Sequence, residues 1–258
     1  MADAFYLPDG DRFLATELTR GPWDPGLQHA GPPAALLGRA VEARERHGMQ
    51  VVRVTFEILR PVPIGPLRVG TRLLRAGRSV ELLEASLRAG DAEVMRATAL
   101  RMRAADLPLP EPAAQPDPLP PPDQGRPVPF FPTGQPVGYH TAMDVRFVAG
   151  SFLDPGPAAV WMRMRHPLLP AEPPSPLVRV LVAADSGNGV SAVLDWRRWR
   201  FVNADLTVSL FRQPAGQWVG LDARTSVSRA GVGLAASTLH DEHGPIGHGL
   251  QSLLVDRR

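Results

Sequence analysis

Hydrophobic and polar residues alternate along much of the first half of the chain. Residues 52 to 58 show this most clearly, because every second side chain is apolar and those between are charged or hydroxylated. A period of two is typical of a half-buried β-strand. Turn signals containing glycine separate further strand-like segments at 67–75, 79–89 and 92–103. Within the first twenty-eight residues, turn signals such as Pro8-Asp9-Gly10 indicate one or two short strands.

A different periodicity precedes these strands. Leu36, Leu37, Ala40 and Val41 fall at helical spacing and follow prolines that a first helical turn tolerates. We predict a helix over 32–46, ended by His47-Gly48. One helix followed by several antiparallel strands indicates an α+β unit whose sheet wraps its helix.

The second half repeats this order. Strands are expected at 145–147, 158–166, 200–212, 218–229, 233–241 and 245–255. Between them, a helix is predicted from Pro176 to about Leu194. Gly187 and Gly189 weaken it by about 1 kcal/mol each relative to alanine. This weak stretch after Asp185 indicates either a kink or a close approach to the backbone.

The two halves also resemble each other in sequence. Residues 54–61 run parallel to 206–213, an offset of 152 (206 − 54), and the Arg-Ala-Gly at 75–77 recurs at 229–231, an offset of 154 (229 − 75). Internal duplication predicts two similar structural units. These offsets pair three polar residues of the second copy with apolar ones of the first: Asp185 with Pro33, Asn203 with Val51, and Gln251 with Ala97. The second copy is therefore expected to carry the functional site.

Twelve prolines lie between residues 107 and 136, a composition typical of an extended connector without regular secondary structure. We expect an N-terminal unit at 1–106, a proline-rich linker at 107–137 and a C-terminal unit at 138–258. A disordered ligand for a proline-binding domain is the alternative role for this segment.

Composition narrows the functional classes. The pI of about 9.8 arises because every basic residue is arginine, while the net charge is only +2, so nucleic-acid binding is not expected. There is no cysteine for a thiolate site, no apolar run of membrane-spanning length and no signal-peptide pattern. A cytoplasmic location is expected. Serine-hydrolase and nucleotide-binding motifs are also missing from the sequence.

One segment resembles a known family. Trp23-x-Pro-x-x-x-His-x-Gly-Pro-Pro-x-Ala-Leu-Leu is similar to the helix entrance of the acyl-CoA thioesterase II (TesB-like) family, and the segments 184–186, 203–205 and 249–251 resemble its second half. The resemblance implies a double hotdog of the α+β class, a homo-oligomer, and hydrolysis of acyl-CoA. We expect no cofactor and no metal. The resemblance also implies that Asp185, Asn203 and Gln251 hold the attacking water, with Asn203 standing where the family has threonine.

Thioester hydrolysis requires a base for the water and donors for the oxyanion. Burial would raise the pKa of Asp185 and suit it as that base; otherwise it is a hydrogen-bonded helix acid. Asn203 and Gln251 would orient the water and polarise the carbonyl, and amides at 186–189 would bind the oxyanion. Two alternatives remain open, a ligand-binding module without turnover and an acyl-CoA dehydratase or hydratase, although the helix at 176–194 contains no histidine.

Other polar residues are weaker candidates. His29 is expected to cap or pack at the helix start rather than act in catalysis. The histidines at 240, 243 and 248 lie near one turn, but their spacing crosses a hairpin and does not favour a metal site. The arginines at 197, 198 and 200 form either a solvated turn or a contact with the phosphates of CoA.

Overall fold

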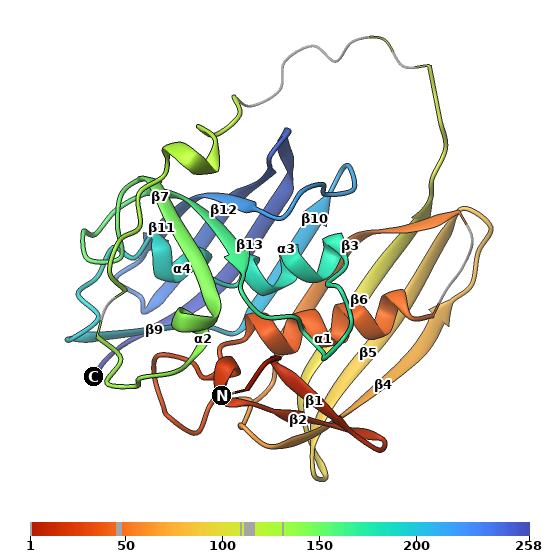
Figure 1. Cartoon of the computed structure of the whole chain (residues 1–258), viewed down its shortest axis with the longest axis horizontal. Helices are drawn as coiled ribbons and strands as arrows, with labels where there is room; N and C mark the ends of the chain where they lie inside the picture. Colours follow the sequence, from red (N-terminus) through yellow and green to blue (C-terminus); the bar gives the residue numbers. More distant parts are fainter. Residues whose placement is uncertain (1, 45–47, 109, 111–116, 131) are drawn as a thin grey trace.

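Two similar halves form the molecule, and each wraps an antiparallel sheet around a helix (Figure 1). The computed structural model describes residues 2–44, 48–108, 110, 117–130 and 132–258. The first half contains β1 (Tyr6–Asp9), β2 (Arg12–Ala15), the 3-10 helix η1 (Glu17–Thr19), α1 (Gly31–Glu42), β3 (Met49–Ile58), β4 (Pro66–Arg75), β5 (Val80–Ala89) and β6 (Ala92–Arg103). The second contains η2 (Pro122–Gln124), α2 (Tyr139–Ala142), β7 (Met143–Ala149), β8 (Ala158–Met164), α3 (Pro176–Ala184), α4 (Gly187–Val190), β9 (Trp199–Asn203), β10 (Asp205–Leu210), β11 (Val219–Val227), β12 (Val232–Asp241) and β13 (Gly244–Arg257).

All strands belong to one continuous sheet with a mirrored order. The order is β1-β2-β4-β5-β6-β3-β10-β13-β12-β11-β8-β7, and β9 pairs with β13. The two halves meet where β3 pairs antiparallel with β10, with Thr55 opposite Thr207. These two threonines are 152 residues apart, which is the offset of the sequence repeat. The predicted duplication and the α+β double-hotdog architecture are thus confirmed.

Helices α1 and α3 pack against each other on the concave side of the sheet (Figure 1). The buried face of α1 includes Leu36, Leu37 and Val41. Two glycines permit the close approach: a Cβ at Gly31 would clash with the carbonyl oxygen of Val182, and one at Gly38 would meet the side chain of Leu181. This packing brings the start of α1 next to the end of α3, where the candidate site lies.

The predicted strands of the first half are confirmed within one or two residues, except that β3 begins earlier, at Met49. The strand predicted at 200–212 is instead two strands that separate at Ala204. Helix α1 ends at Glu42 rather than at 46. There the guanidinium of Arg101 donates hydrogen bonds to the carbonyls of Val41 and Arg44 and satisfies the end of the helix. His47 lies outside the described residues.

The helix predicted from Pro176 to Leu194 breaks after Ala184 and resumes as the short α4. A close approach explains the glycine at the start of α4. A Cβ on Gly187 would lie 2.7 Å from Ser237 Oγ and 2.9 Å from Gln251 Oε1. Both alternatives expected from the sequence, a kink and a close backbone contact, therefore occur here.

Strand register tests the pairing of the two copies. Asn203 pairs with Leu253 and Val51 with Arg101, and each second-copy residue is 152 positions beyond its first-copy counterpart (203 − 51 and 253 − 101), so the equivalence of Asn203 and Val51 is confirmed. The same register makes Ala99, not Ala97, the counterpart of Gln251, because Leu250 lies opposite Thr207 as Thr98 lies opposite Thr55.

The equivalence of Asp185 and Pro33 is wrong. Pro33 lies in the first turn of α1, whereas Asp185 directly follows α3. The helices differ in length and lie outside the strand ladders, so the strand offset does not transfer to them.

The second part of the proline-rich segment packs on the second half. The carbonyl of Pro120 accepts a hydrogen bond from Trp161 Nε1, and Arg126 pairs with Phe147 beside β7. Pro122–Gln124 forms the 3-10 helix η2, so the expectation of no regular structure is wrong at that point. Among the described residues, no helix is both long enough and apolar enough to cross a membrane.

Candidate active site

A cavity of about 790 Å³ lies between the loop that precedes α1, the end of β3, and the α2, α3–α4 and β9 region of the second half. Much of its wall is apolar. Five apolar side chains come from the segment before α2 and from β7, β8 and the loop between them: Phe130, Met143, Val145, Phe152 and Met162. Polar side chains gather in one part of the wall, where α1 begins and α3 ends: His29, Asp185, Ser186, Asn188 and Asn203.

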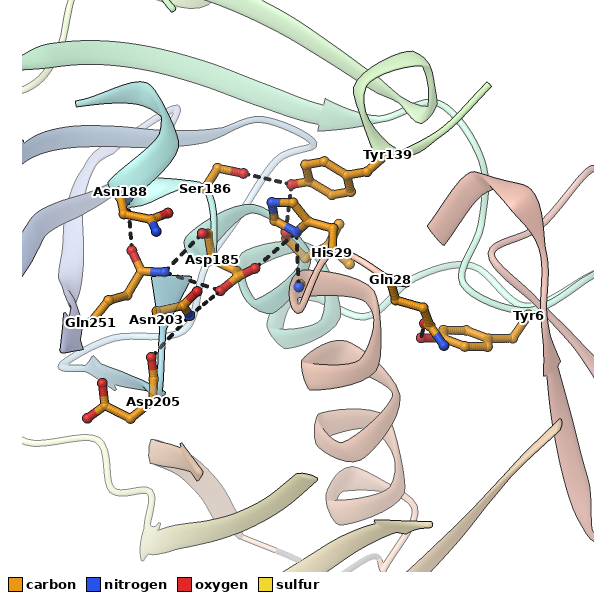
Figure 2. A network of polar contacts seen from close by, with 12 residues as sticks. Tyr6, Gln28, His29, Tyr139, Asp185, Ser186, Asn188, Asn203, Asp205 and Gln251 are labelled. Atoms are coloured by element: carbon orange, nitrogen blue, oxygen red, sulfur yellow. Dashed lines mark hydrogen bonds and ion pairs between the residues drawn. The ribbon is translucent and has the colours of Figure 1, made fainter. Parts of the chain in front are cut away.

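Asp185 lies at the centre of this polar group, with amides on one side of its carboxyl group and an imidazole on the other (Figure 2). It is only 4% exposed. Its Oδ1 accepts hydrogen bonds from Asn203 Nδ2 at 2.8 Å and from Gln251 Nε2 at 3.2 Å. The structure thus brings together all three residues that the sequence singled out.

Gln251 lies behind Asp185, away from the cavity. Its Nε2 donates to both the backbone oxygen and Oδ1 of Asp185, and its Oε1 accepts the backbone N–H of Asn188 at 2.9 Å. Because Nε2 faces two acceptors and Oε1 faces a donor, the orientation of the Gln251 amide group is fixed. Gln251 is buried, and it is not among the described residues that line the cavity. Its bonds hold Asp185 and α4 in place.

Asn203 lies at the end of β9, on the cavity wall. Its Nδ2 donates to Asp185 Oδ1 and, at 3.2 Å, to the backbone oxygen of Asp205. Both partners are acceptors, so the nitrogen must point toward them. The carbonyl oxygen Oδ1 of Asn203 therefore remains as a hydrogen-bond acceptor for a molecule in the cavity.

His29 approaches Asp185 from the first half of the chain. Its Nδ1 lies 3.0 Å from Asp185 Oδ2 and 3.1 Å from the backbone nitrogen of Gly31. The imidazole stacks on the ring of Tyr139, with 3.8 Å between centroids and 7° between planes. Tyr139 is itself fixed, because its hydroxyl donates to the carbonyl of Val182 at 2.8 Å and lies 2.9 Å from Ser186 Oγ.

The start of α1 provides further donors. Ala30, the N-cap residue, has no side chain that can accept a bond from the helix. The backbone N–H of Ala30 instead donates to Asp185, and that of Gly31 is shared between Asp185 and His29 Nδ1. The positive end of the helix dipole favours a negatively charged acceptor such as the Asp185 carboxylate. A carboxylate from the second unit thus caps the helix of the first.

Burial dominates the ionisation of both groups. It raises the pKa of Asp185 to about 7, although the bonds from Asn203, Gly31, Ala30 and Gln251 favour the ionised form. It lowers the pKa of His29 to about 3. At neutral pH the imidazole is therefore uncharged, and the carboxyl group is close to the middle of its titration.

Two family models together match most of the sequence. Residues 19–102 match the acyl-CoA thioesterase N-terminal domain, and residues 111–255 match the acyl-CoA thioesterase C-terminal domain. The chain belongs to the acyl-CoA thioesterase family. The enzyme is a thioester hydrolase.

Solved structures show the same fold along the whole thioesterase. A protein assigned as a thioesterase II from Thermobifida fusca YX superimposes with a TM-score of 0.78 at 20% identity, covering 98% of this chain and 95% of that one. The acyl-CoA thioesterase II TesB2 of Mycobacterium marinum superimposes with a TM-score of 0.69 at 18% identity, covering 97% of this chain and 94% of that one. A hot-dog-fold protein of unknown function from Alicyclobacillus acidocaldarius superimposes with a TM-score of 0.74 at 20% identity, covering 99% of this chain and 97% of that one. No curated protein sequence matches the chain.

The expectation that His29 caps or packs at the start of α1 is confirmed, but it did not include the contact of His29 with Asp185. Its Nδ1 accepts from Gly31, and the residue also faces the cavity. One signal was available: no Ser, Thr, Asp or Asn precedes α1 at its N-cap, so the cap had to come from elsewhere in the fold.

Backbone amides at 186–189 were expected to bind an oxyanion, and three of them are already engaged. Ser186 N–H donates to Ala183, Asn188 N–H to Gln251, and Gly189 N–H to Ser186. The expectation is wrong for these three groups.

The remaining residues singled out from the sequence do not gather at the site. Of the arginines at 197, 198 and 200, only Arg200 lines the cavity, where Arg60 and Arg258 join it. Arg197 instead lies over the ring of Trp196. Among the described residues, no three metal-ligating side chains gather into a site.

Proposed function

We propose that this thioesterase hydrolyses acyl-CoA to a free carboxylic acid and CoA by means of a water molecule activated at Asp185. The observation that carries the proposal is the buried carboxyl group of Asp185, held by Asn203 and Gln251 beside a largely apolar cavity. A carboxyl group with a pKa of about 7 is suited to exchanging a proton at neutral pH.

The two amides have different roles in this proposal. Asn203 presents Oδ1 to the cavity, where it accepts a hydrogen from the attacking water and orients one lone pair toward the substrate. Gln251 acts through Asp185, because its amide group is fully engaged with Asp185 and Asn188. Asparagine in place of threonine therefore still leaves an acceptor for the water.

The wall of the cavity fits the two ends of an acyl-CoA. Apolar side chains such as Phe130, Phe152 and Met162 suit the acyl chain. Three arginines that also line the cavity, Arg60, Arg200 and Arg258, suit the phosphates of CoA, which guanidinium groups bind through paired hydrogen bonds. The thioester would then lie between them, next to Asp185.

We also propose a homo-oligomer in the cytoplasm. Exposed apolar residues on the outer face of the sheet support association, since Val232 lies opposite Leu254 in the pairing of β12 with β13, and Leu234 and Leu250 are exposed on the same two strands.

The direct test is release of CoA thiol from short, medium and long acyl-CoAs by the wild type and by Asp185→Asn. We expect turnover by the wild type and a loss of at least about 100-fold in the variant. Asp222→Asn, which changes an exposed carboxylate on β11, is the matched control. Acyl-CoA binding without turnover by the wild type would contradict the proposal and favour a binding module.

A hydratase or dehydratase on the same fold is the second candidate, because the structure places His29 beside Asp185 although the helix at 176–194 has no histidine. Loss of the enoyl-CoA absorbance without release of thiol would identify that activity. Thiol release from saturated acyl-CoAs would identify hydrolysis.

A further inference from the structure

The contact between His29 Nδ1 and Asp185 Oδ2 is 3.0 Å long, and both atoms are acceptors unless one carries a proton. A bare imidazole nitrogen and a bare carboxylate oxygen repel each other at that distance. A proton therefore lies between them. While it is on Asp185 Oδ2, His29 Nδ1 accepts the N–H of Gly31; once Asp185 ionises, Nδ1 carries the proton and the Gly31 N–H donates to Asp185 instead. The two side chains titrate as one unit that keeps a proton in its interior.

We propose that His29 receives the proton of the attacking water on Nε2 and passes its own Nδ1 proton to Asp185. The inference rests on the proposed hydrolysis and names the atom that touches the water. Asp185 holds the proton until the tetrahedral intermediate collapses, and His29 becomes a catalytic residue.

Crowding around the carboxyl group is the first argument. A carboxylate offers about four lone-pair positions. In its ionised form Asp185 has five donors around it, from the side chains of Asn203 and Gln251, the protonated Nδ1 of His29, and the backbone of Gly31 and Ala30. With only 4% of the residue exposed, an attacking water has little direct access to either oxygen.

Nε2 of His29 is accessible by contrast. His29 lines the cavity, and its side chain is 14% exposed. No described residue forms a hydrogen bond with this nitrogen, and it is not among the fully buried side-chain atoms that lack a partner. A water molecule in the cavity can therefore reach Nε2.

The orientation of the ring is fixed on two sides. The stack on Tyr139 sets the plane of the imidazole, and the contacts of Nδ1 with Asp185 and Gly31 set its rotation (Figure 2). A fixed ring lowers the entropy that is lost when the water, the base and the thioester are aligned.

A relay avoids a buried cation. Burial lowers the pKa of His29 to about 3, so an imidazolium in this place is unfavourable. When Nε2 gains a proton and Nδ1 gives one to Asp185, the ring stays neutral throughout. The raised pKa of Asp185, about 7, makes the carboxyl group the better final acceptor. In a serine-protease triad the histidine takes the proton and the aspartate stays ionised. Here the order is reversed, because the pKa of Asp185 is higher than that of His29.

The reaction balances with these groups alone. One O–H bond of water breaks, its proton goes to Nε2, and the oxygen forms a bond to the thioester carbon. At the same time the Nδ1 proton moves to Asp185 Oδ2. The tetrahedral intermediate then collapses, its C–S bond breaks, and the Nε2 proton goes to sulfur while Asp185 returns its proton to Nδ1. The products are a carboxylic acid and the thiol of CoA.

Other ionisable groups face the same cavity and are relevant to its pH dependence. The tyrosine that stacks on His29, Tyr139, has a pKa that burial raises, so it stays neutral. The remaining ones in the wall are Asp24, Arg60, His140, Arg200 and Arg258. Burial lowers the pKa of His140 below its ordinary value.

The test compares His29→Asn with the wild type. The asparagine amide reaches the position of Nδ1 and can still donate to Asp185, but nothing replaces Nε2. We expect kcat to fall by at least about 100-fold with KM changed less than about threefold. His248→Asn, an exposed histidine on β13, is the control and should keep full activity. A His29→Asn enzyme that keeps kcat within about threefold, while Asp185→Asn is inactive, would overturn the relay and leave hydrolysis intact.

A spectroscopic readout separates catalysis from packing. In ¹⁵N-histidine spectra of the wild type above about pH 8, the relay requires a proton on Nδ1 of His29 and none on Nε2. This pattern, with a titration near neutral pH that Asp185→Asn removes, would support the relay. A proton on Nε2 under these conditions would overturn it even if His29→Asn is inactive. Absence of thiol release by the wild type would instead refute the proposed function.

Discussion

Thr207 donates a hydrogen bond from Oγ1 to Oγ1 of Thr55, at 3.2 Å, across the pairing of β10 with β3. The two residues are counterparts in the sequence repeat and also direct neighbours in the sheet. The approximate two-fold axis of the molecule therefore passes between them. Each half repeats the other's strands about this point, while His29 and Asp185 contribute different chemistry from opposite halves.

Asp185 and His29 should make opposite contributions to the pH dependence of the unfolding free energy. The folded pKa of Asp185, about 7, lies above its ordinary value of 3.8, so this group makes folding less favourable as pH rises between those values. The folded pKa of His29, about 3, lies below its ordinary 6.5, so this group makes folding more favourable over an overlapping range. In the wild type the two effects oppose each other.

We therefore expect a weak dependence of the unfolding free energy on pH for the wild type between about pH 4.5 and about pH 6.5. Asp185→Asn should gain stability with rising pH, and His29→Asn should lose it, each by at most about 1.4 kcal/mol per pH unit. Urea denaturation at several pH values measures these slopes. If the unfolding free energies of the three proteins varied with pH in parallel, the raised pKa of Asp185 and the lowered pKa of His29 would be contradicted.

Gln251→Leu should weaken both the fold and the site. It leaves the buried N–H of Asn188 without its acceptor and removes the two hydrogen bonds that Gln251 Nε2 donates to Asp185, at a cost of about 1–3 kcal/mol in unfolding free energy. Because Gln251 acts through Asp185, kcat should fall while KM changes little. Gln217→Leu, at an exposed position, serves as the control. Full activity of Gln251→Leu would show that Asp185 is positioned without this amide.

The two glycines of α4 should respond in opposite ways to alanine. A Cβ at Gly187 would meet Ser237 and Gln251, so Gly187→Ala is expected to lower both the melting temperature and kcat. Nothing lies within 4 Å of a Cβ at Gly189, so Gly189→Ala should raise stability by up to about 1 kcal/mol through helix propensity. Calorimetry of the two variants decides this, and equal melting temperatures would contradict the close approach.

The arginines of the cavity can be tested with a truncated substrate. Arg200→Gln combined with Arg258→Gln should raise KM for acyl-CoA by about tenfold, which corresponds to about 1.4 kcal/mol of phosphate binding. The KM for the matching acyl-pantetheine, which lacks the nucleotide, should stay unchanged. Arg224→Gln, on the exposed side of β11, is the control. An equal rise for both substrates would place these arginines elsewhere than at the phosphates.

The strands could be predicted from the sequence because their alternation and their turns are local. The same holds for Asn203, whose equivalence with Val51 follows from a strand register that the repeat preserves. Asp185 was found because an acid in an apolar helix is rare, although its supposed counterpart, Pro33, was wrong.

The contact between His29 and Asp185 could not be predicted, because it depends on how two helices pack. The distance between His29 and Asp185 is set by the approach of α1 to α3, which the small residue Gly31 permits. Nothing within a few residues of either side chain encodes that distance.

The division of the site between two copies has a consequence for how such an enzyme can change. In a symmetric dimer of a single unit, a substitution at the helix entrance appears twice and alters two centres together. In this chain the entrance that carries His29 and the helix end that carries Asp185 are separate stretches of sequence, so each can vary without altering its counterpart. Fusion of the copies thereby reduces the number of catalytic centres and allows each half to specialise.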